Sequence, residues 1–175
     1  CGSSVSTPVR SGSVPEGRLF HRECQAGSPC TWVWMPRLTP PEAAPGDRFG
    51  AALAIDGARL VAAAPSSDLE STECGALFVF ELEGDTWTQV QTLTAGPDAP
   101  PFAGLGACVA LAGDLAVAGS KSANKAWLFE RVEASFGPAQ VLTDPEAGQL
   151  GMALATDGAR VLVGAPGTNA TAIKS

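Results

Sequence analysis

The sequence has little charge, a single histidine and no long apolar run. Charged residues make up 17% and hydrophobic residues 45% of the 175 residues, which indicates a folded chain with a sizeable core. The net charge of −7 disfavours nucleic acid and anionic membrane surfaces as partners. The longest apolar stretch, residues 105–119, is interrupted at Gly113-Asp114 and is shorter than the roughly 18 residues that a membrane-spanning helix needs.

The sequence also lacks the motifs of common catalytic and metal sites. It has no Gly-x-Ser-x-Gly elbow, phosphate-binding loop, Cys-x-x-Cys pair or zinc-ligand cluster. The only histidine, His21, stands beside Arg22 and Glu23 on an expected outer strand, and we interpret it as a solvated strand residue. Cys108 falls on an expected inner strand, where a buried and inert thiol is the expected state. We therefore predict no catalytic residues, no enzyme activity and no cofactor.

Residues 1–16 differ in composition from the rest of the chain. Cys1 is followed by a stretch of Ser, Thr, Pro, Gly and Val that extends to about Pro15. This resembles the start of a mature bacterial lipoprotein, in which the first cysteine carries lipid and a flexible polar tether follows. The alternative is an arbitrary start point. The resemblance implies a lipid on Cys1 as the only membrane contact, and a location at the outer surface of the cell envelope, or secretion.

Three segments repeat one pattern, and their aligned glycines lie 56 and 45 residues apart. The aligned glycines are Gly50, Gly106 and Gly151. In each segment, small and β-branched residues stand on both sides of a turn pair, as in a β-hairpin. The turn pairs are Asp56-Gly57, Gly113-Asp114 and Asp157-Gly158. The high Ala and Gly content suits a place where neighbouring sheets approach closely.

Two further strands accompany each hairpin. The first is expected over 17–23, 75–81 and 125–131. The second has an aromatic residue six positions before a leucine, in the pairs Trp32 and Leu38, Trp87 and Leu93, and Phe136 and Leu142. The predicted unit is therefore a sheet of four short antiparallel strands, as in one blade of a β-propeller.

The Phe49-Gly50 opening, the short hairpin and the Gly164-Ala165-Pro166 close resemble FG-GAP repeats, which occur in integrin α-chain propellers and many bacterial surface proteins. The resemblance covers roughly residues 17–166, although Phe49 is replaced by Leu105 and Leu150 in the other copies. It implies an all-β fold over 17–175, with about three four-stranded antiparallel blades of a β-propeller that form an incomplete ring.

Integrin-type FG-GAP blades often hold calcium in a loop rich in aspartate. Calcium takes about six to eight oxygen ligands, so several carboxylates must converge within one loop. Each turn of this sequence offers a single aspartate, namely Asp56, Asp114 or Asp157. We interpret these residues as turn formers and predict no metal site.

The four tryptophans, Trp32, Trp34, Trp87 and Trp127, leave two interpretations open. They could form a surface on which carbohydrate stacks. Three of them recur at blade-strand positions, however, and are expected to pack between blades, whereas Trp34 has no counterpart in the other repeats.

We predict a disulfide between Cys24 and Cys30, which flank a Gly- and Pro-containing loop between two outer strands. Antiparallel neighbours bring Cβ atoms to about 4.5–5.5 Å, close to bridging distance. If Cys1 carries lipid, four cysteines remain, an even number that is consistent with an oxidising compartment. A bridge between Cys74 and Cys108 stays open as a further pairing.

Two classes of function are compatible with these features. The first is a cell-surface or secreted binding or adhesion module whose blade-rim loops recognise protein or glycan, with the binding residues unassigned. The second is a non-catalytic structural segment of a larger envelope protein.

Counting the expected strands gives an incomplete ring. The chain starts with the outer half of a blade and ends with the inner half of another, and three blades are fewer than the roughly four to eight of known propellers. We therefore expect either that the chain continues past Ser175 or that it associates with itself.

We predict that folding does not depend on calcium, because each turn supplies too few oxygen ligands. Thermal melting curves recorded with EDTA and with millimolar calcium should coincide. An upward shift of the melting temperature with calcium would contradict this interpretation of the turns.

Overall fold

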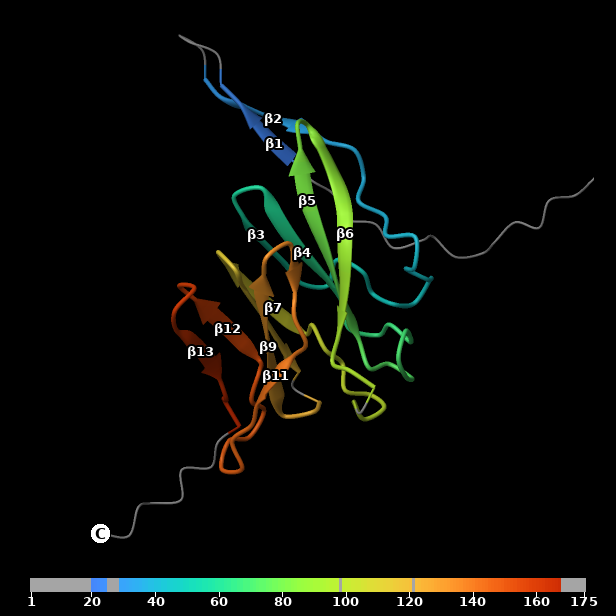
Figure 1. Cartoon of the computed structure of the whole chain (residues 1–175), viewed down its shortest axis with the longest axis vertical. Coiled ribbons are helices and arrows are strands. Elements are labelled where there is room, and N and C mark those ends of the chain that lie inside the picture. The colour runs from blue at the N-terminus through green and yellow to red at the C-terminus, as the bar shows by residue number, and fades with distance from the viewer. Residues whose placement is uncertain (1–19, 25–28, 98, 121, 168–175) are drawn as a thin grey trace, which may run out of the picture.

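The computed structural model describes residues 20–24, 29–97, 99–120 and 122–167, and within these ranges the chain forms strands, turns and loops without a helix (Figure 1). The all-β prediction is therefore confirmed for the described residues. Nothing in these ranges could serve as a membrane-spanning helix.

Two complete antiparallel blades form the centre of the structure. Blade A contains β3 (Leu53–Asp56), β4 (Arg59–Ala64), β5 (Ala76–Glu83) and β6 (Thr86–Thr94), paired in that order. Blade B contains β7 (Cys108–Ala112), β8 (Leu115–Ser120) and β9 (Lys125–Val132). Its fourth strand is divided into β10 (Ser135–Phe136) and β11 (Gln140–Leu142), which both pair with β9. The intervening Gly137-Pro138-Ala139 divides this strand, because proline cannot donate a ladder hydrogen bond.

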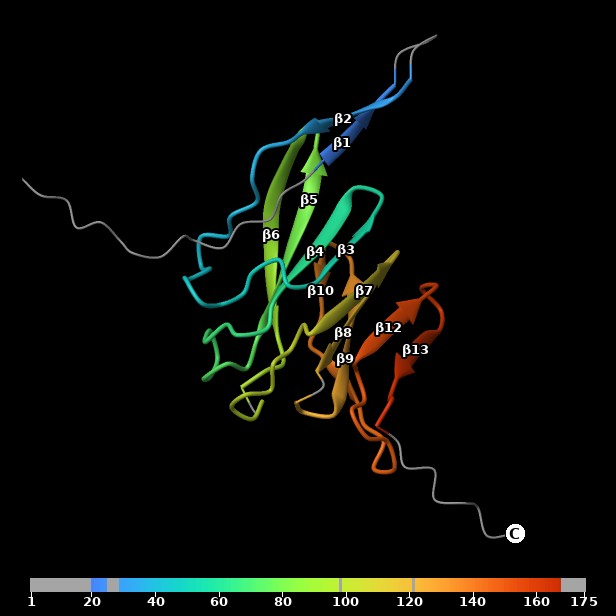
Figure 2. The same ribbon diagram turned by 180° about the vertical axis from the view of Figure 1, so that it is seen from behind.

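Two half-blades lie at opposite ends of the described structure (Figures 1 and 2). The outer pair consists of β1 (Phe20–Glu23) and β2 (Thr31–Trp34), and the inner pair consists of β12 (Ala153–Thr156) and β13 (Val161–Gly164). In the described sheets, each pair is hydrogen-bonded only within itself. The three inner and three outer pairs expected from the sequence are thus present, and two of each combine into complete blades.

The first two inner hairpins have two-residue loops, Gly57-Ala58 and Gly113-Asp114. In both loops the glycine has a φ of 56° while the following residue keeps a negative φ, the pattern of a type II′ turn. The tight turn is therefore confirmed, although in blade A it begins one residue later than Asp56.

The third hairpin has a wider turn than the sequence pattern predicts. Thr156 pairs with Val161, so the loop contains the four residues 157–160. Asp157 Oδ1 accepts hydrogen bonds from the backbone N–H groups of Ala159 (3.0 Å) and Arg160 (2.7 Å). These bonds hold the pKa of Asp157 below its usual value and stabilise the wider loop. The prediction of a tight two-residue turn is wrong here.

The main core lies between blades A and B. We call the face of each blade that points toward the next blade along the chain its forward face, and the opposite one its rear face. Because side chains alternate along a strand, Val61 and Ala63 of β4 lie on the forward face of blade A, and Ala116 and Ala118 of β8 lie on the rear face of blade B. The larger buried members of this core are Leu77, Val79, Leu93, Leu105, Trp127, Phe129 and Phe136.

Repeat glycines set the spacing of the inner strands. A Cβ atom on Gly106 would lie 2.7 Å from the Cβ of Ala63, and one on Gly151 would lie 3.1 Å from the Cα of Gly119. Both glycines also have a positive φ, of 96° and 87°. A side chain at either position would therefore force the blades apart.

The opening of each repeat has one backbone geometry. Arg48, Gly104 and Gln149 occupy equivalent positions and have φ values of 60°, 60° and 61°. The next residue is buried in all three repeats, as Phe49, Leu105 and Leu150. The change from phenylalanine to leucine thus keeps a buried apolar anchor. Phe49 additionally packs edge-on against Phe78 and Phe80 on the rear face of blade A, with ring centroids 5.6 and 6.3 Å apart.

We predict that Gly106→Ala lowers the free energy of unfolding by about 1–3 kcal/mol more than Gly113→Ala does. Both glycines have a positive φ, so both substitutions carry a backbone cost of roughly 1–2 kcal/mol. Only at Gly106 would the new methyl group meet a neighbouring strand, because a Cβ on Gly113 would meet open space. Urea unfolding followed by tryptophan fluorescence measures the difference. Equal losses would show that the blades do not depend on this close approach.

Candidate binding sites on the blade rims

The blades have two rims, which differ in the length of the connections between strands. Because the strands are antiparallel, the long connections after β2, β4, β6 and β11 reach one end of the blades, which we call the long-loop rim. The short turns after β3, β5, β7, β9 and β12, of two to four residues, reach the other end, the short-turn rim. Long connections tolerate sequence change better than strands do, so the long-loop rim is where a binding site is expected.

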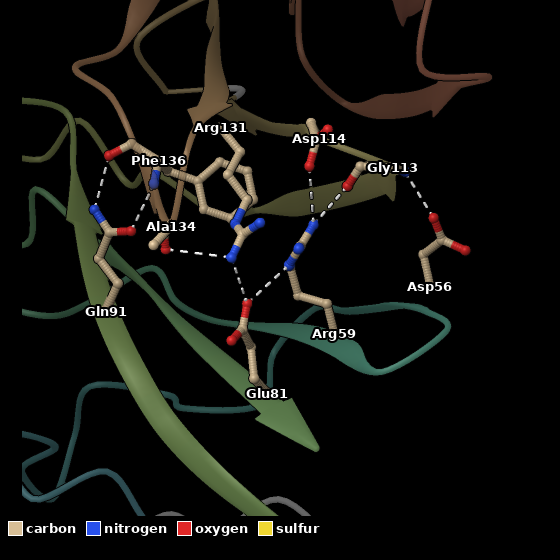
Figure 3. A network of polar contacts seen from close by, with 9 residues as sticks. All are labelled: Asp56, Arg59, Glu81, Gln91, Gly113, Asp114, Arg131, Ala134 and Phe136. Carbon is tan, nitrogen blue, oxygen red and sulfur yellow. Dashed lines mark hydrogen bonds and ion pairs between the residues drawn. The ribbon is translucent and has the colours of Figure 1, made fainter. Parts of the chain in front are cut away.

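On the short-turn rim, charged side chains join blade A to blade B (Figure 3). Glu81 Oε1 lies 3.4 Å from Arg59 Nε and 3.1 Å from Arg131 Nη2. Arg59 Nη1 also donates to the carbonyl oxygen of Gly113 at 2.7 Å and lies 3.6 Å from Asp114 Oδ1. The Arg59 guanidinium stands 5.6 Å from the Phe136 ring centroid, within cation–π range.

Further hydrogen bonds in the same region also cross between the blades. The backbone N–H of Gly113 donates to Asp56 Oδ2 at 2.6 Å. Gln91 makes two bonds of 2.8 Å with the backbone of Phe136, one as donor and one as acceptor (Figure 3). The polar groups of this network satisfy one another across the blade interface, so we assign it a structural role.

The three turn aspartates do not converge. Asp56 and Asp114 are engaged in different contacts of the interface network, and Asp157 binds the backbone of its own turn. In the described ranges, no group of three or more His, Cys, Asp or Glu side chains is arranged to hold a metal ion. The independence from calcium stays a prediction for the melting experiment.

On the long-loop rim, a pocket of about 300 Å³ lies between the connections that follow β4 and β6. Its lining consists of Arg48, Ala51, Pro65, Ser66, Glu73, Phe102, Gly104, Ala107 and Ser122. Three backbone hydrogen bonds tie the two connections together. The N–H groups of Phe102, Gly104 and Leu105 donate to the carbonyl oxygens of Thr72 (2.8 Å), Glu73 (3.0 Å) and Cys74 (2.9 Å). The walls of the pocket are therefore held in place by backbone contacts.

Phe102 has an unfavourable backbone conformation for its residue type. The Ala103 N–H donates to the Pro100 carbonyl oxygen at 3.1 Å, Pro101 is the second residue of this turn, and Phe102 is the third, with a φ of 61°. This is the pattern of a type II turn, whose third position favours glycine. The equivalent turn before blade A places Gly46 there, with a φ of 107°.

The side chain of Phe102 is 59% exposed, and the pocket that it lines also contains the exposed, oppositely charged residues Arg48 and Glu73. A large exposed aromatic residue at a position where glycine would serve the turn better is not explained by folding. The pocket around Phe102 is therefore the candidate binding site. The sequence analysis did not identify it, although the replacement of Pro45-Gly46 by Pro101-Phe102 in aligned linkers was a signal.

The tryptophans divide into two groups. Trp127 is buried between the blades and Trp87 is half-buried at the rear of blade A, as expected of packing residues. Trp32 is 67% exposed, so the prediction that it packs between blades is wrong for this structure. The reason is that, among the described strands, no inner pair lies beside β1–β2. Trp34 is exposed too and contacts the Phe20 ring, with centroids 4.6 Å apart.

The predicted disulfide between Cys24 and Cys30 is present and closes the β1–β2 hairpin. Cys74 and Cys108 are both free thiols, so the further pairing is not formed. His21 lies in β1, as expected. Cys1 and the rest of residues 1–16 lie outside the described ranges, and the lipidation and tether predictions stay predictions.

Cys108 has no feature of an activated thiol. Its Sγ donates to the carbonyl oxygen of Gly151 at 2.9 Å, on the forward face of blade B. Burial raises the pKa of the thiol and outweighs the opposing effect of a backbone hydrogen bond from Gly119. A raised pKa leaves less thiolate near neutral pH, which agrees with the interpretation of Cys108 as inert.

We predict that, at pH 8, iodoacetamide alkylates Cys108 more slowly in the folded chain than in the urea-unfolded chain, because the folded thiol has the higher pKa. The difference should shrink as the pH rises through that pKa. Mass mapping of the Cys108 peptide separates its reaction from that of Cys74. Equal rates in the folded and unfolded chains would contradict the inert interpretation.

Comparison with known proteins agrees with this architecture. The family model described as FG-GAP repeat matches residues 32–80, which extend from β2 into β5. No curated protein matches the chain. FG-GAP repeats are found in adhesion and binding modules of integrin-like proteins, and the family is generally non-catalytic. The match covers one repeat, and the two complete blades and two half-blades of the described residues are consistent with an incomplete propeller built from such repeats.

Proposed function

We propose that the chain is a non-catalytic binding module of the cell surface or of the secreted fraction, and that its long-loop rim binds a protein partner through the pocket around Phe102. The observation that carries the proposal is the exposed aromatic side chain on a backbone conformation that favours glycine. Holding phenylalanine at positive φ costs roughly 1–2 kcal/mol, yet more than half of the Phe102 surface stays exposed to solvent.

The chemistry of the pocket fits a protein partner. Binding hot spots are enriched in aromatic residues and arginine, and they tend to be surrounded by polar groups that complement the partner. Phe102 supplies the aromatic anchor, while Arg48 and Glu73 supply one charge of each sign. The backbone hydrogen bonds between the two connections hold Phe102 and Glu73 before binding, which limits the entropy lost on association.

The proposed location follows from the first residues of the chain and from the disulfide. A lipid on Cys1 and a tether over residues 1–16 would leave the blades outside the membrane. Disulfides such as Cys24–Cys30 persist in oxidising compartments, which include the bacterial periplasm and cell surfaces. The competing function, a structural segment of a larger envelope protein, requires no ligand at the long-loop rim.

We predict that Phe102→Gly weakens binding of the partner at least about tenfold and does not lower the free energy of unfolding. The substitution removes the aromatic anchor and also removes the strain of a bulky residue at positive φ. The immobilised chain is first used to isolate a partner from cell-surface protein, and the affinities of both forms are then measured by calorimetry.

Val132→Thr is the matched control, since Val132 is 67% exposed but lies at the end of β9 on the short-turn rim. This variant should bind as tightly as the unsubstituted chain. Equal binding by Phe102→Gly would rule out the pocket as the site. Absence of any saturable protein partner would favour the structural alternative.

A further inference from the structure

Two side chains of opposite charge line the pocket around Phe102 without pairing with each other. Arg48 belongs to the connection that follows β2, and Glu73 belongs to the connection that follows β4. Both residues are exposed. Among the described residues, neither the guanidinium of Arg48 nor the carboxylate of Glu73 takes part in a hydrogen bond or an ion pair. The pocket therefore presents one unpaired positive charge and one unpaired negative charge.

Backbone contacts anchor the two charged residues. The carbonyl oxygen of Arg48 accepts a hydrogen bond from the N–H of Ala51 at 3.1 Å. The backbone N–H of Glu73 donates to Asp68 Oδ1 at 2.6 Å, and the carbonyl oxygen of Glu73 accepts from the N–H of Gly104 at 3.0 Å. The side chains of Arg48 and Glu73 thus extend from an anchored backbone and do not themselves contribute to the anchoring.

Arg48, Glu73 and Phe102 share an unusual backbone conformation. Their φ values are 60°, 47° and 61°, in a region where a side chain costs free energy and glycine does not. At the position equivalent to Arg48, blade B has Gly104 with the same φ of 60°, so the fold accepts glycine there. Residues held in this region cluster at ligand-binding sites, and these three line one pocket.

The two charges restrict the chemistry of the ligand. A ligand that matches both of them must carry a cation and an anion. Nucleic acids and acidic glycans supply anions, whereas a protein segment supplies both charges through Lys or Arg and through Asp or Glu. The Phe102 ring can cover the apolar stem of a lysine or arginine and attract its cationic group. The pocket volume of about 300 Å³ is small for a ligand site and suits one or two side chains of a segment.

We propose that the pocket around Phe102 recognises a partner segment by one basic and one acidic side chain, with the basic group on Glu73 and the acidic group on Arg48. The proposal rests on the proposed function and adds to it the charge pattern by which the partner is chosen. A segment with the opposite placement of charges would bring like charges together, which weakens binding. The site therefore distinguishes segments by their polarity as well as by an apolar contact to Phe102.

The test uses random peptides displayed on phage, which are selected on the immobilised chain. Only peptides whose binding is weakened by Phe102→Gly are kept. The tightest of them is also prepared in a charge-exchanged form, in which each acidic residue is replaced by a basic one and each basic residue by an acidic one. The matching chain variant combines Arg48→Glu with Glu73→Arg and so keeps the net charge of −7.

The unsubstituted chain should bind the original peptide at least about fivefold more tightly than the charge-exchanged peptide, and the charge-exchanged chain should have the reverse preference. Calorimetry measures the four affinities, and thermal melting shows whether each variant is folded. The single variants Arg48→Gln and Glu73→Gln remove one charge each and should each reduce the preference of the unsubstituted chain.

Glu133→Arg is the matched control. Glu133 is exposed, has a φ of 58° and lies in the turn after β9 on the short-turn rim, so the same exchange is made away from the pocket. This variant should keep the preference for the original peptide. Peptides that depend on Phe102 but bind equally well in both charge forms would overturn this proposal alone. If no selected peptide depends on Phe102, the proposed function fails, and this proposal fails with it.

Discussion

Close packing of small residues between the inner strands is the contact on which the rest of this structure depends. Gly106 fits against Ala63, and Gly151 fits against Gly119, with no room for a side chain at either glycine. Because the inner strands approach so closely, bulky residues such as Leu77 and Phe129 are placed on the next strands outward, β5 and β9, where they fill the core. The salt bridges of Glu81 with Arg59 and Arg131 join the same two blades at one rim.

Linking the blades through their cores and the short-turn rim leaves the opposite rim free to vary. The connections after β4 and β6 are joined by backbone hydrogen bonds, so their position does not depend on particular side chains. This arrangement explains how the turn before blade B can carry Phe102 where the turn before blade A carries Gly46. The proposed binding site follows from this difference between two copies of one unit.

The same repetition accounts for the exposed apolar residues at the two ends. By their position in the repeat, Leu162, Leu53 and Ile55 correspond to core residues, but all three side chains are exposed in the described structure. Each inner hairpin of the repeat is built to pack against a neighbour on both faces. In the described structure, the rear face of β3 and the forward face of β13 have no such neighbour. The exposure of Trp32 has the same origin, since its strand pair has no inner partner in the described structure.

The sequence by itself determined the repeat, the strand order within a blade, the first two turns and the Cys24–Cys30 pairing. These features depend on contacts between residues that are close along the chain, and alternation and turn chemistry report such contacts directly. Only the tertiary structure decided which faces of the blades are covered by a neighbouring blade. It also placed Asp56, Asp114 and Arg59 in the interface between blades A and B. Finally, it showed that Phe102 has a positive φ and lines a pocket with Arg48 and Glu73. These outcomes depend on how whole blades pack, and residues more than 50 positions apart carry no local pattern that records their contact.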